Sequence, residues 1–163
     1  MNMLIKQKEI SPSLPQKLAA LLEGEHNCIA NLSNASALLF EMIDNINWAG
    51  FYLIHNKELI LGPFQGKVAC VHIALGKGVC GTAASQDQTL IVDNVHEFAG
   101  HIACDSASNS EIVIPLHAHG QVVGVLDIDS PLFSRFSSAE ARLLEQAAKI
   151  IENYCDLSVL CTL

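Results

Sequence analysis

The sequence predicts an α+β fold in which a central antiparallel sheet of five or six strands packs against helices. Apolar residues recur at helical spacing over the first third of the chain, the period then changes to two, and helical spacing returns near the C-terminus. The chain has 163 residues, which is long enough for one sizeable core. We therefore expect a single domain over residues 1–163.

Two helices are predicted before the sheet and one after it. Residues 13–23 predict a short helix, and a second helix starts after Asn27, with an apolar stripe that continues to Ile46. Ser137 is followed three residues later by Glu140, a spacing typical of a capping box. This pair therefore predicts the start of the last helix.

The segment between these helices is predicted to form the sheet. Residues 48–54 alternate between two faces, as a strand does. The remaining strands are predicted over residues 58–61, 69–74, 89–92, 111–116 and 121–129. We expect Gly62-Pro63 to interrupt the sheet and residues 79–85 to form a short helix. Residues 93–110 have no period, and long loops of this kind are usually functional.

The charge of the chain excludes some partners. The formal net charge is −8, which argues against nucleic acid or an anionic membrane as the main partner. No Lys or Arg occurs between Gly78 and Ser134, whereas the same stretch contains many acids. A ligand bound there is therefore expected to carry an ammonium group rather than a phosphate.

Neither a membrane span nor a secretory signal is apparent. No apolar run approaches the roughly 18–20 residues that cross a bilayer. The N-terminus lacks a long hydrophobic stretch followed by a small-residue cleavage site. We therefore expect a cytoplasmic protein with reduced thiols.

The chain has six cysteines, which is many for a cytosolic protein. A structural disulfide framework is not expected in that compartment, so burial, metal binding and catalysis remain. Cys28 lies on a helical stripe, which favours a core position, and Cys155 and Cys161 are given no role.

Three cysteines lie in the acidic, Gly- and Ser-rich region. Cys104 lies in the long polar loop, where a thiol is accessible enough to act as a nucleophile. Cys80 lies near the start of a predicted helix, whose dipole is expected to lower the thiol pKa. Cys70 lies nearby in a predicted strand. Each of these cysteines could instead be an inert buried thiol, but the presence of three cysteines in one region favours redox chemistry.

Zinc binding is the competing interpretation of this region. The available ligands are Cys70, His72, Cys80, His101 and Cys104. However, there is no Cys-x-x-Cys pair and no His-x₃₋₅-His pair, which structural zinc sites typically use. We therefore expect no metal.

Three acids form a second group of candidates. Asp127 and Asp129 are two apart on one predicted strand, so both point to the same face, and Glu111 begins the partner strand. Acids usually lie in solvent. If these are buried they need a partner, such as a ligand ammonium, or they raise one another's pKa until one is protonated and can donate a hydrogen bond.

Two aromatic residues share one strand face. Trp48 and Tyr52 flank Gly50, which would leave room for a ligand to approach. Aromatic residues are usually core, but this pair can also cage an apolar or sulfonium-like methyl group.

Several strings around these residues resemble one known family, the free methionine-(R)-sulfoxide reductases, which are built on a GAF-type domain. The resemblance covers about residues 13–153 and rests on NWAGFY (47–52), LGPFQGK (61–67), GVCGTA (78–83), GHIACDS (100–106) and GVLDIDS (124–130). The cysteine-containing strings are more specific than a general GAF pattern. GAF domains bind many ligands, so the fold alone would not imply the activity.

The resemblance implies a thiol mechanism. Cys104 would attack the sulfoxide sulfur, releasing methionine and leaving a sulfenic acid. Cys70 or Cys80 would then form a disulfide with Cys104, and thioredoxin, supplied with electrons by NADPH, would reduce it. No bound cofactor is implied.

The resemblance also implies a binding site and an assembly. Glu111, Asp127 and Asp129 would hold the substrate ammonium and polarise the sulfoxide oxygen, while Trp48 and Tyr52 would enclose the methyl-sulfur end. A homodimer is implied as well. The alternatives are a GAF-type sensor that binds a small ligand or redox signal without turnover, and a zinc-stabilised interaction domain.

Overall fold

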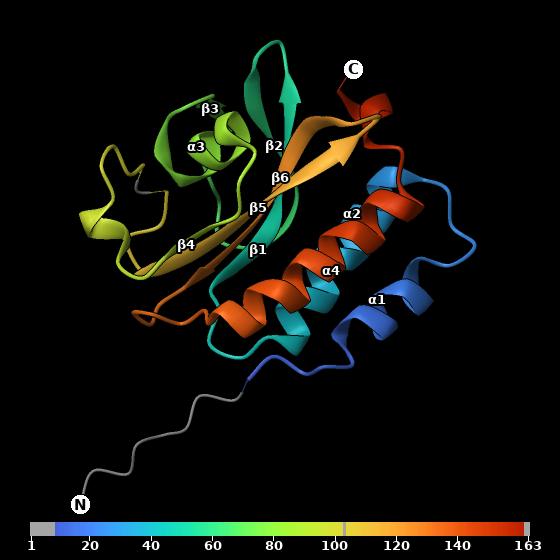
Figure 1. Cartoon of the computed structure of the whole chain (residues 1–163), viewed down its shortest axis with the longest axis horizontal. Coiled ribbons are helices and arrows are strands. Elements are labelled where there is room, and N and C mark those ends of the chain that lie inside the picture. Colours follow the sequence, from blue (N-terminus) through green and yellow to red (C-terminus); the bar gives the residue numbers. More distant parts are fainter. Residues whose placement is uncertain (1–8, 103, 162–163) are drawn as a thin grey trace, which may run out of the picture.

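A computed structural model describes residues 9–102 and 104–161. Within these residues, six antiparallel strands form one sheet in the order β3–β2–β1–β6–β5–β4 (Figure 1). The strands are β1 (Trp48–His55), β2 (Glu58–Gly66), β3 (His72–Ala74), β4 (Leu90–Val92), β5 (Ser110–Ala118) and β6 (Gln121–Ser130). The predicted α+β fold with a central antiparallel sheet is thus confirmed.

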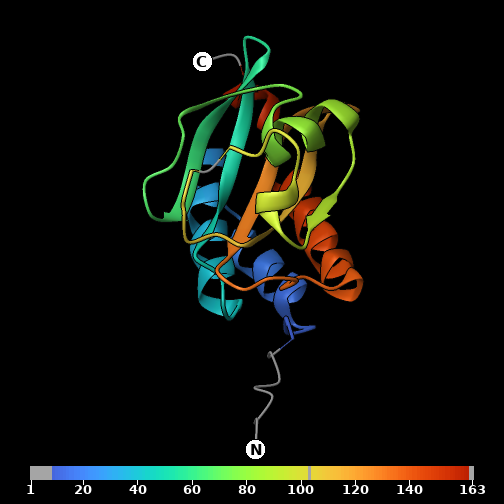
Figure 2. The ribbon, with the colours of Figure 1, turned by 90° about the vertical axis from the view of Figure 1, so that its left-hand side faces the viewer.

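The helices divide between the two faces of the sheet. Three of them cover one face and one lies on the other, together with the long loop (Figures 1 and 2). The helices are α1 (Leu14–Leu22), α2 (Cys28–Met42), α3 (Gly78–Gln86) and α4 (Ser138–Tyr154), with 3₁₀ turns η1 (Val95–Glu97) and η2 (Leu157–Leu160). Helix α3 is the one that lies on the second face of the sheet. None of the helices in the described ranges is long and apolar enough to cross a membrane.

The alternation along β1 supplies both cores, as predicted. Ala49 and Phe51 belong to the large core against α1, α2 and α4. Trp48 and Tyr52 point the other way, into a smaller core with residues of α3. The α3 side of the sheet is therefore less filled by helices, which leaves space for a site there.

Strand β2 does not stop at Gly62-Pro63, so the predicted interruption is wrong. The pairing of β1 with β2 shifts between Gly50 and Tyr52, which places Gly62-Pro63 in a bulge. A bulge leaves backbone groups outside the ladder, so a residue without an N–H is tolerated there. The strand therefore continues to Gly66.

Strand β3 is shorter than the predicted strand over residues 69–74. The backbone N–H of Leu61 still donates to the carbonyl oxygen of Val71 at 2.9 Å. The next donor on that side of β2 would come from Pro63, which has no N–H. Pairing ends there, and Cys70 lies in the loop before β3 rather than in a strand.

The predicted capping box begins α4. The Glu140 backbone N–H donates to Ser137 Oγ at 3.2 Å, and the Ser137 N–H donates to Glu140 Oε2 at 2.9 Å. The same carboxylate forms a buried ion pair with Arg135, with Nη1 and Oε1 2.7 Å apart. Arg135 also donates to the carbonyl oxygen of Asp44 after α2, at 3.0 Å. Arg135 thus links the segment after α2 to the start of α4 through one hydrogen bond and one ion pair.

Glu140→Gln should lower the free energy of unfolding by about 3 kcal/mol at neutral pH, because it leaves the buried Arg135 charge unpaired. Burial opposes ionisation of Glu140, but hydrogen bonds from Ser137 and Arg135 lower its pKa below 4.5. The stabilisation is therefore present above about pH 4.5 and is lost as pH falls through the folded-state pKa. Denaturant unfolding checks this, with the exposed Glu145→Gln on the same helix as control; equal losses in both variants would contradict it.

Candidate active site

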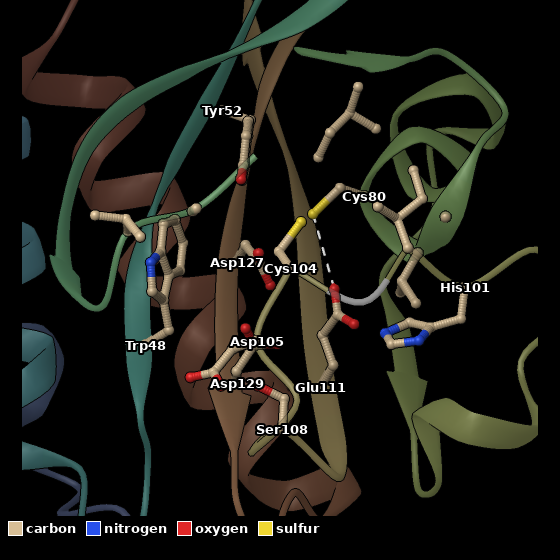
Figure 3. Close-up of a pocket in the computed structure, with 16 residues that line it drawn as sticks. Trp48, Tyr52, Cys80, His101, Cys104, Asp105, Ser108, Glu111, Asp127 and Asp129 are labelled. Atoms are coloured by element: carbon tan, nitrogen blue, oxygen red, sulfur yellow. Dashed lines mark hydrogen bonds between the residues drawn. The ribbon is translucent and has the colours of Figure 1, made fainter. Parts of the chain in front are cut away.

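A small cavity lies between the α3 side of the sheet and the long loop (Figure 3). Its volume is about 40 Å³, which holds only a few water-sized molecules. The predicted site residues that line it are Trp48 and Tyr52 from β1, Cys80 from α3, Cys104 from the loop, Glu111 from β5, and Asp127 and Asp129 from β6. The fold thus gathers seven of the eight predicted site residues around one space.

The eighth predicted residue, Cys70, is joined to Cys104 by a disulfide. Their Cα atoms are 5.6 Å apart, which is an ordinary separation for such a bond. The bond connects the loop before β3 to the loop between η1 and β5. The sequence left Cys70 and Cys80 open as partners of Cys104, and the structure pairs Cys104 with Cys70.

Cys80 is a free thiol inside the cavity wall. It is 5% exposed, and its Sγ donates to Glu111 Oε1 at 3.8 Å (Figure 3). Burial, followed by the charges of Asp127 and Glu111, raises the Cys80 pKa well above 9.0. The prediction that the helix start lowers this pKa is therefore wrong, because desolvation and nearby acids outweigh the helix dipole.

The three acids face one another across β5 and β6, as predicted. Glu111 is paired in the ladder with Asp129, and Asp127 lies two residues before it on β6. Glu111 is 6% exposed, Asp127 is 5% exposed, and Asp129 is partly buried. Glu111 and Asp127 therefore do not lie in solvent at the strand ends, which was the alternative for these acids.

Burial changes the protonation of these acids. Burial first, and then the charges of Asp127 and Asp129, raise the Glu111 pKa well above 4.5. Burial also raises the Asp127 pKa to about 6. Oδ1 of Asp127 is buried without a hydrogen-bond partner, and no Lys or Arg is among the described residues that line the cavity. The cavity therefore suits a ligand that brings both positive charge and hydrogen-bond donors.

The two aromatic residues form one wall and also hold the Cys70 loop. Their rings stack with centroids 5.8 Å apart. The Tyr52 hydroxyl donates to the Cys70 carbonyl oxygen at 2.9 Å, and Trp48 Nε1–H donates to the Lys67 carbonyl oxygen at 3.2 Å. Burial raises the Tyr52 pKa, with Asp127 the next contributor, so the hydroxyl stays a donor.

The space expected beside Gly50 is not available to a ligand. A Cβ at Gly50 would meet the Cβ of Phe64 and the Trp48 ring at 2.8 Å or less. The Phe64 ring stacks on Trp48, with centroids 5.1 Å apart. Glycine is needed here so that β1 and β2 can pack their own side chains, and the prediction of a ligand gap is wrong.

Sequence reasoning missed a polar group beside the cavity. The amide nitrogen of Asn47 donates to Asp105 Oδ2 at 3.1 Å and to Ser108 Oγ at 3.0 Å. Asp105 and Ser108 both line the cavity, as does His101, which the sequence suggested only as a zinc ligand. The signal that points to them is their density in the aperiodic loop around Cys104.

The structure does not assemble the five-residue zinc set considered from sequence. His72 is exposed and pairs with Glu58 on β2 at 3.1 Å, instead of facing the cavity. Cys70 and Cys104 are bonded to each other. A zinc centre built from those five residues is therefore excluded in this state.

Comparison with known proteins agrees with this architecture. The GAF domain family model matches residues 10–154. The chain is 50% identical over 148 residues to a free methionine-R-sulfoxide reductase of Escherichia coli, covering 91% of this chain and 90% of that protein. It is 45% identical over 159 residues to the Saccharomyces cerevisiae enzyme of the same name, covering 93% and 88%.

A solved structure is similar as well. The fRMsr of Staphylococcus aureus in complex with substrate superposes with a TM-score of 0.85 at 52% identity, covering 90% of this chain and 99% of that one. The fold and the matched model define a GAF domain, here with a thiol- and acid-lined cavity. Within that class, the chain belongs to the free methionine-R-sulfoxide reductase family.

Asp127→Asn should stabilise the protein at neutral pH. The folded pKa of about 6 lies above the ordinary 3.8, so the folded state loses stability as pH rises through this window, and the full penalty applies above it. The uncharged variant should gain about 3 kcal/mol in unfolding free energy at about pH 8, and no more than a small difference should remain at about pH 3.5. Denaturant unfolding at both pH values checks this, and a variant less stable at high pH would contradict it.

Proposed function

We propose that this protein reduces free methionine (R)-sulfoxide to methionine. The observation that carries the proposal is the convergence of Cys104 with the buried acids Glu111 and Asp127 on one cavity. Relatives at 50% and 45% identity carry the name of this activity, and the similar S. aureus structure is a complex with substrate. The acids alone would fit many cationic ligands, and the thiol adds the redox chemistry.

Substrate binding uses the unmatched charge of the cavity. Asp127 and Asp129, on one face of β6, bind the substrate ammonium, which supplies the missing positive charge. Glu111, whose pKa is raised by burial and by the charges of Asp127 and Asp129, donates a hydrogen bond to the sulfoxide oxygen in its protonated form. Trp48 and Tyr52 enclose the methyl and sulfur end of the ligand.

The first chemical step consumes one thiol. The Cys104 thiolate attacks the sulfoxide sulfur while the oxygen is protonated, and the S–O bond breaks as that oxygen passes to Cys104. The products are methionine and a Cys104 sulfenic acid, so the sulfoxide has gained two electrons and Cys104 has lost two.

Cys70 resolves the sulfenic acid. Its thiol attacks the Cys104 sulfur, forms the disulfide seen in the structure and releases water. Cys80 is less suited to this step because its raised pKa keeps it a neutral thiol hydrogen-bonded to Glu111. This argument selects between the two partners that the sequence left open.

An external dithiol completes the cycle. Thioredoxin, reduced through NADPH, takes up the oxidising equivalents by disulfide exchange, and no bound cofactor takes part. Recycling of this kind requires a reducing compartment, which supports a cytoplasmic location. The homodimer stays a prediction, which sedimentation of the purified protein would check.

Single substitutions of Cys104, Cys70 and Cys80 should have different effects in a thioredoxin-coupled assay of NADPH oxidation. Cys104→Ser should form no methionine, because the nucleophile is gone. Cys70→Ser should form one methionine per enzyme and then stop, because the sulfenic acid is not resolved. Cys80→Ser should continue through multiple turnovers.

Methionine release per enzyme in single and multiple turnover gives the readout, with Cys161→Ser as the control cysteine outside the cavity. Absence of turnover by the wild type would favour the sensor interpretation. A single-turnover limit in Cys80→Ser, instead of Cys70→Ser, would make Cys80 the resolving residue.

Tyr52→Phe should slow recycling more than the first turnover. The lost hydrogen bond to the Cys70 carbonyl is worth about 1 kcal/mol, so disulfide formation should slow roughly fivefold. The first methionine should appear at nearly the wild-type rate. Rapid-quench measurement of methionine and of free thiols distinguishes the two steps, with the exposed Tyr154→Phe as control. Equal slowing of both steps would show that Tyr52 acts on the substrate instead.

A further inference from the structure

A second property of the cavity concerns three side chains that can share one cation. We propose that the cavity reversibly binds one Zn²⁺ through Cys80, Glu111 and Asp127. The cation would occupy Asp127, which binds the substrate ammonium, and Glu111, which donates to the sulfoxide oxygen, and would thereby inhibit the enzyme. Only this inhibitory consequence rests on the proposed function; the binding itself does not.

The geometry is that of a compact ligand set. One ligand atom from each of the three residues lies within 4.8 Å of the other two. Cys80 Sγ and Glu111 Oε1 are 3.8 Å apart. Zinc–ligand distances of about 2.0–2.3 Å place the ligand atoms of a tetrahedral site roughly 3.3–3.8 Å apart. Small side-chain movements therefore suffice to bring all three atoms onto one ion.

The three ligands come from three different elements. Glu111 and Asp127 lie on the paired strands β5 and β6, and Cys80 lies in the first turn of α3, against those strands. All three are buried, so their positions are fixed by packing before any ion arrives. Such preorganisation lowers the cost of binding.

An unsatisfied atom points independently to a ligand. Asp127 is 5% exposed, yet its Oδ1 has no hydrogen-bond partner. No Lys or Arg is found among the described residues around the cavity to neutralise it. A divalent cation would satisfy this oxygen and, by displacing the proton of Glu111, would bind both buried carboxylates.

The donor set favours zinc over hard cations. One thiolate and two carboxylates match the borderline softness of Zn²⁺, whereas Mg²⁺ and Ca²⁺ require about six or more oxygen ligands. Three protein ligands leave one tetrahedral position for water. Binding must remove the Cys80 proton and any proton shared by the acids, so affinity should rise with pH.

Direct binding can be measured without any turnover. The protein, with the Cys70–Cys104 disulfide formed, is titrated with Cd²⁺, whose bond to a thiolate gives an ultraviolet charge-transfer band. The band should saturate at one equivalent, and Zn²⁺ should displace Cd²⁺ while Mg²⁺ should not. A chromophoric chelator then measures the Zn²⁺ affinity by competition.

Variants locate the ion. Cys80→Ser should lose the band, and Cys161→Ser, a cysteine outside the cavity, should keep it. Asp127→Asn should weaken Zn²⁺ binding by at least about tenfold, a loss that even outer-shell changes produce. Circular dichroism confirms that each variant is folded, and Asp127→Asn tests the site if Cys80→Ser does not fold. A band that survives in Cys80→Ser but disappears in Cys155→Ser would place the metal elsewhere and overturn the proposal.

Inhibition is a separate measurement on the reduced enzyme. Zn²⁺ should raise the KM for methionine sulfoxide and leave kcat unchanged, because the cation and the substrate ammonium compete for Asp127. Turnover without one-equivalent metal binding would overturn this inference and leave the proposed function standing. Binding of one equivalent of metal by a protein that shows no turnover would support this inference and overturn the proposed function.

Discussion

The arrangement of this molecule depends on the burial of carboxylates without a protein counter-charge. β5 and β6 are paired so that Glu111 and Asp127 face the same cavity, and the described residues that line it include no Lys or Arg. Such an arrangement costs stability in the empty protein, and a cation or a proton must offset it. The ammonium of an amino acid and a metal ion meet this need in different ways, which is why one cavity suits both.

Substrate recognition and thiol chemistry use residues from different parts of the fold. The acids stand on long central strands, where ladder pairing on both sides of β6 holds them in place. The disulfide-bonded Cys70 and Cys104 lie in irregular segments, and Cys104 lines the same cavity. Recognition thus uses residues of the sheet, whereas the sulfur atoms that must bond and separate in each cycle belong to segments outside the sheet.

Much of this could be predicted from the sequence, for identifiable reasons. Period-two alternation placed Trp48 and Tyr52 on one face, and the spacing of Asp127 and Asp129 did the same for the acids. The length of β2 and β3 could not be predicted, because the effect of Pro63 depends on the register of the neighbouring strands. The pKa of Cys80 was predicted with the wrong sign, since a helix position is visible in sequence but the surrounding burial is not.

The size of the cavity has a consequence for the oxidised enzyme. With Cys70 and Cys104 bonded, the cavity holds only a few water-sized molecules, far less than a whole amino acid. The oxidised form therefore has little capacity to retain product or to take up fresh sulfoxide. Abundant methionine sulfoxide would therefore hold little of the oxidised enzyme in an unproductive complex, and the disulfide would stay available to the electron donor.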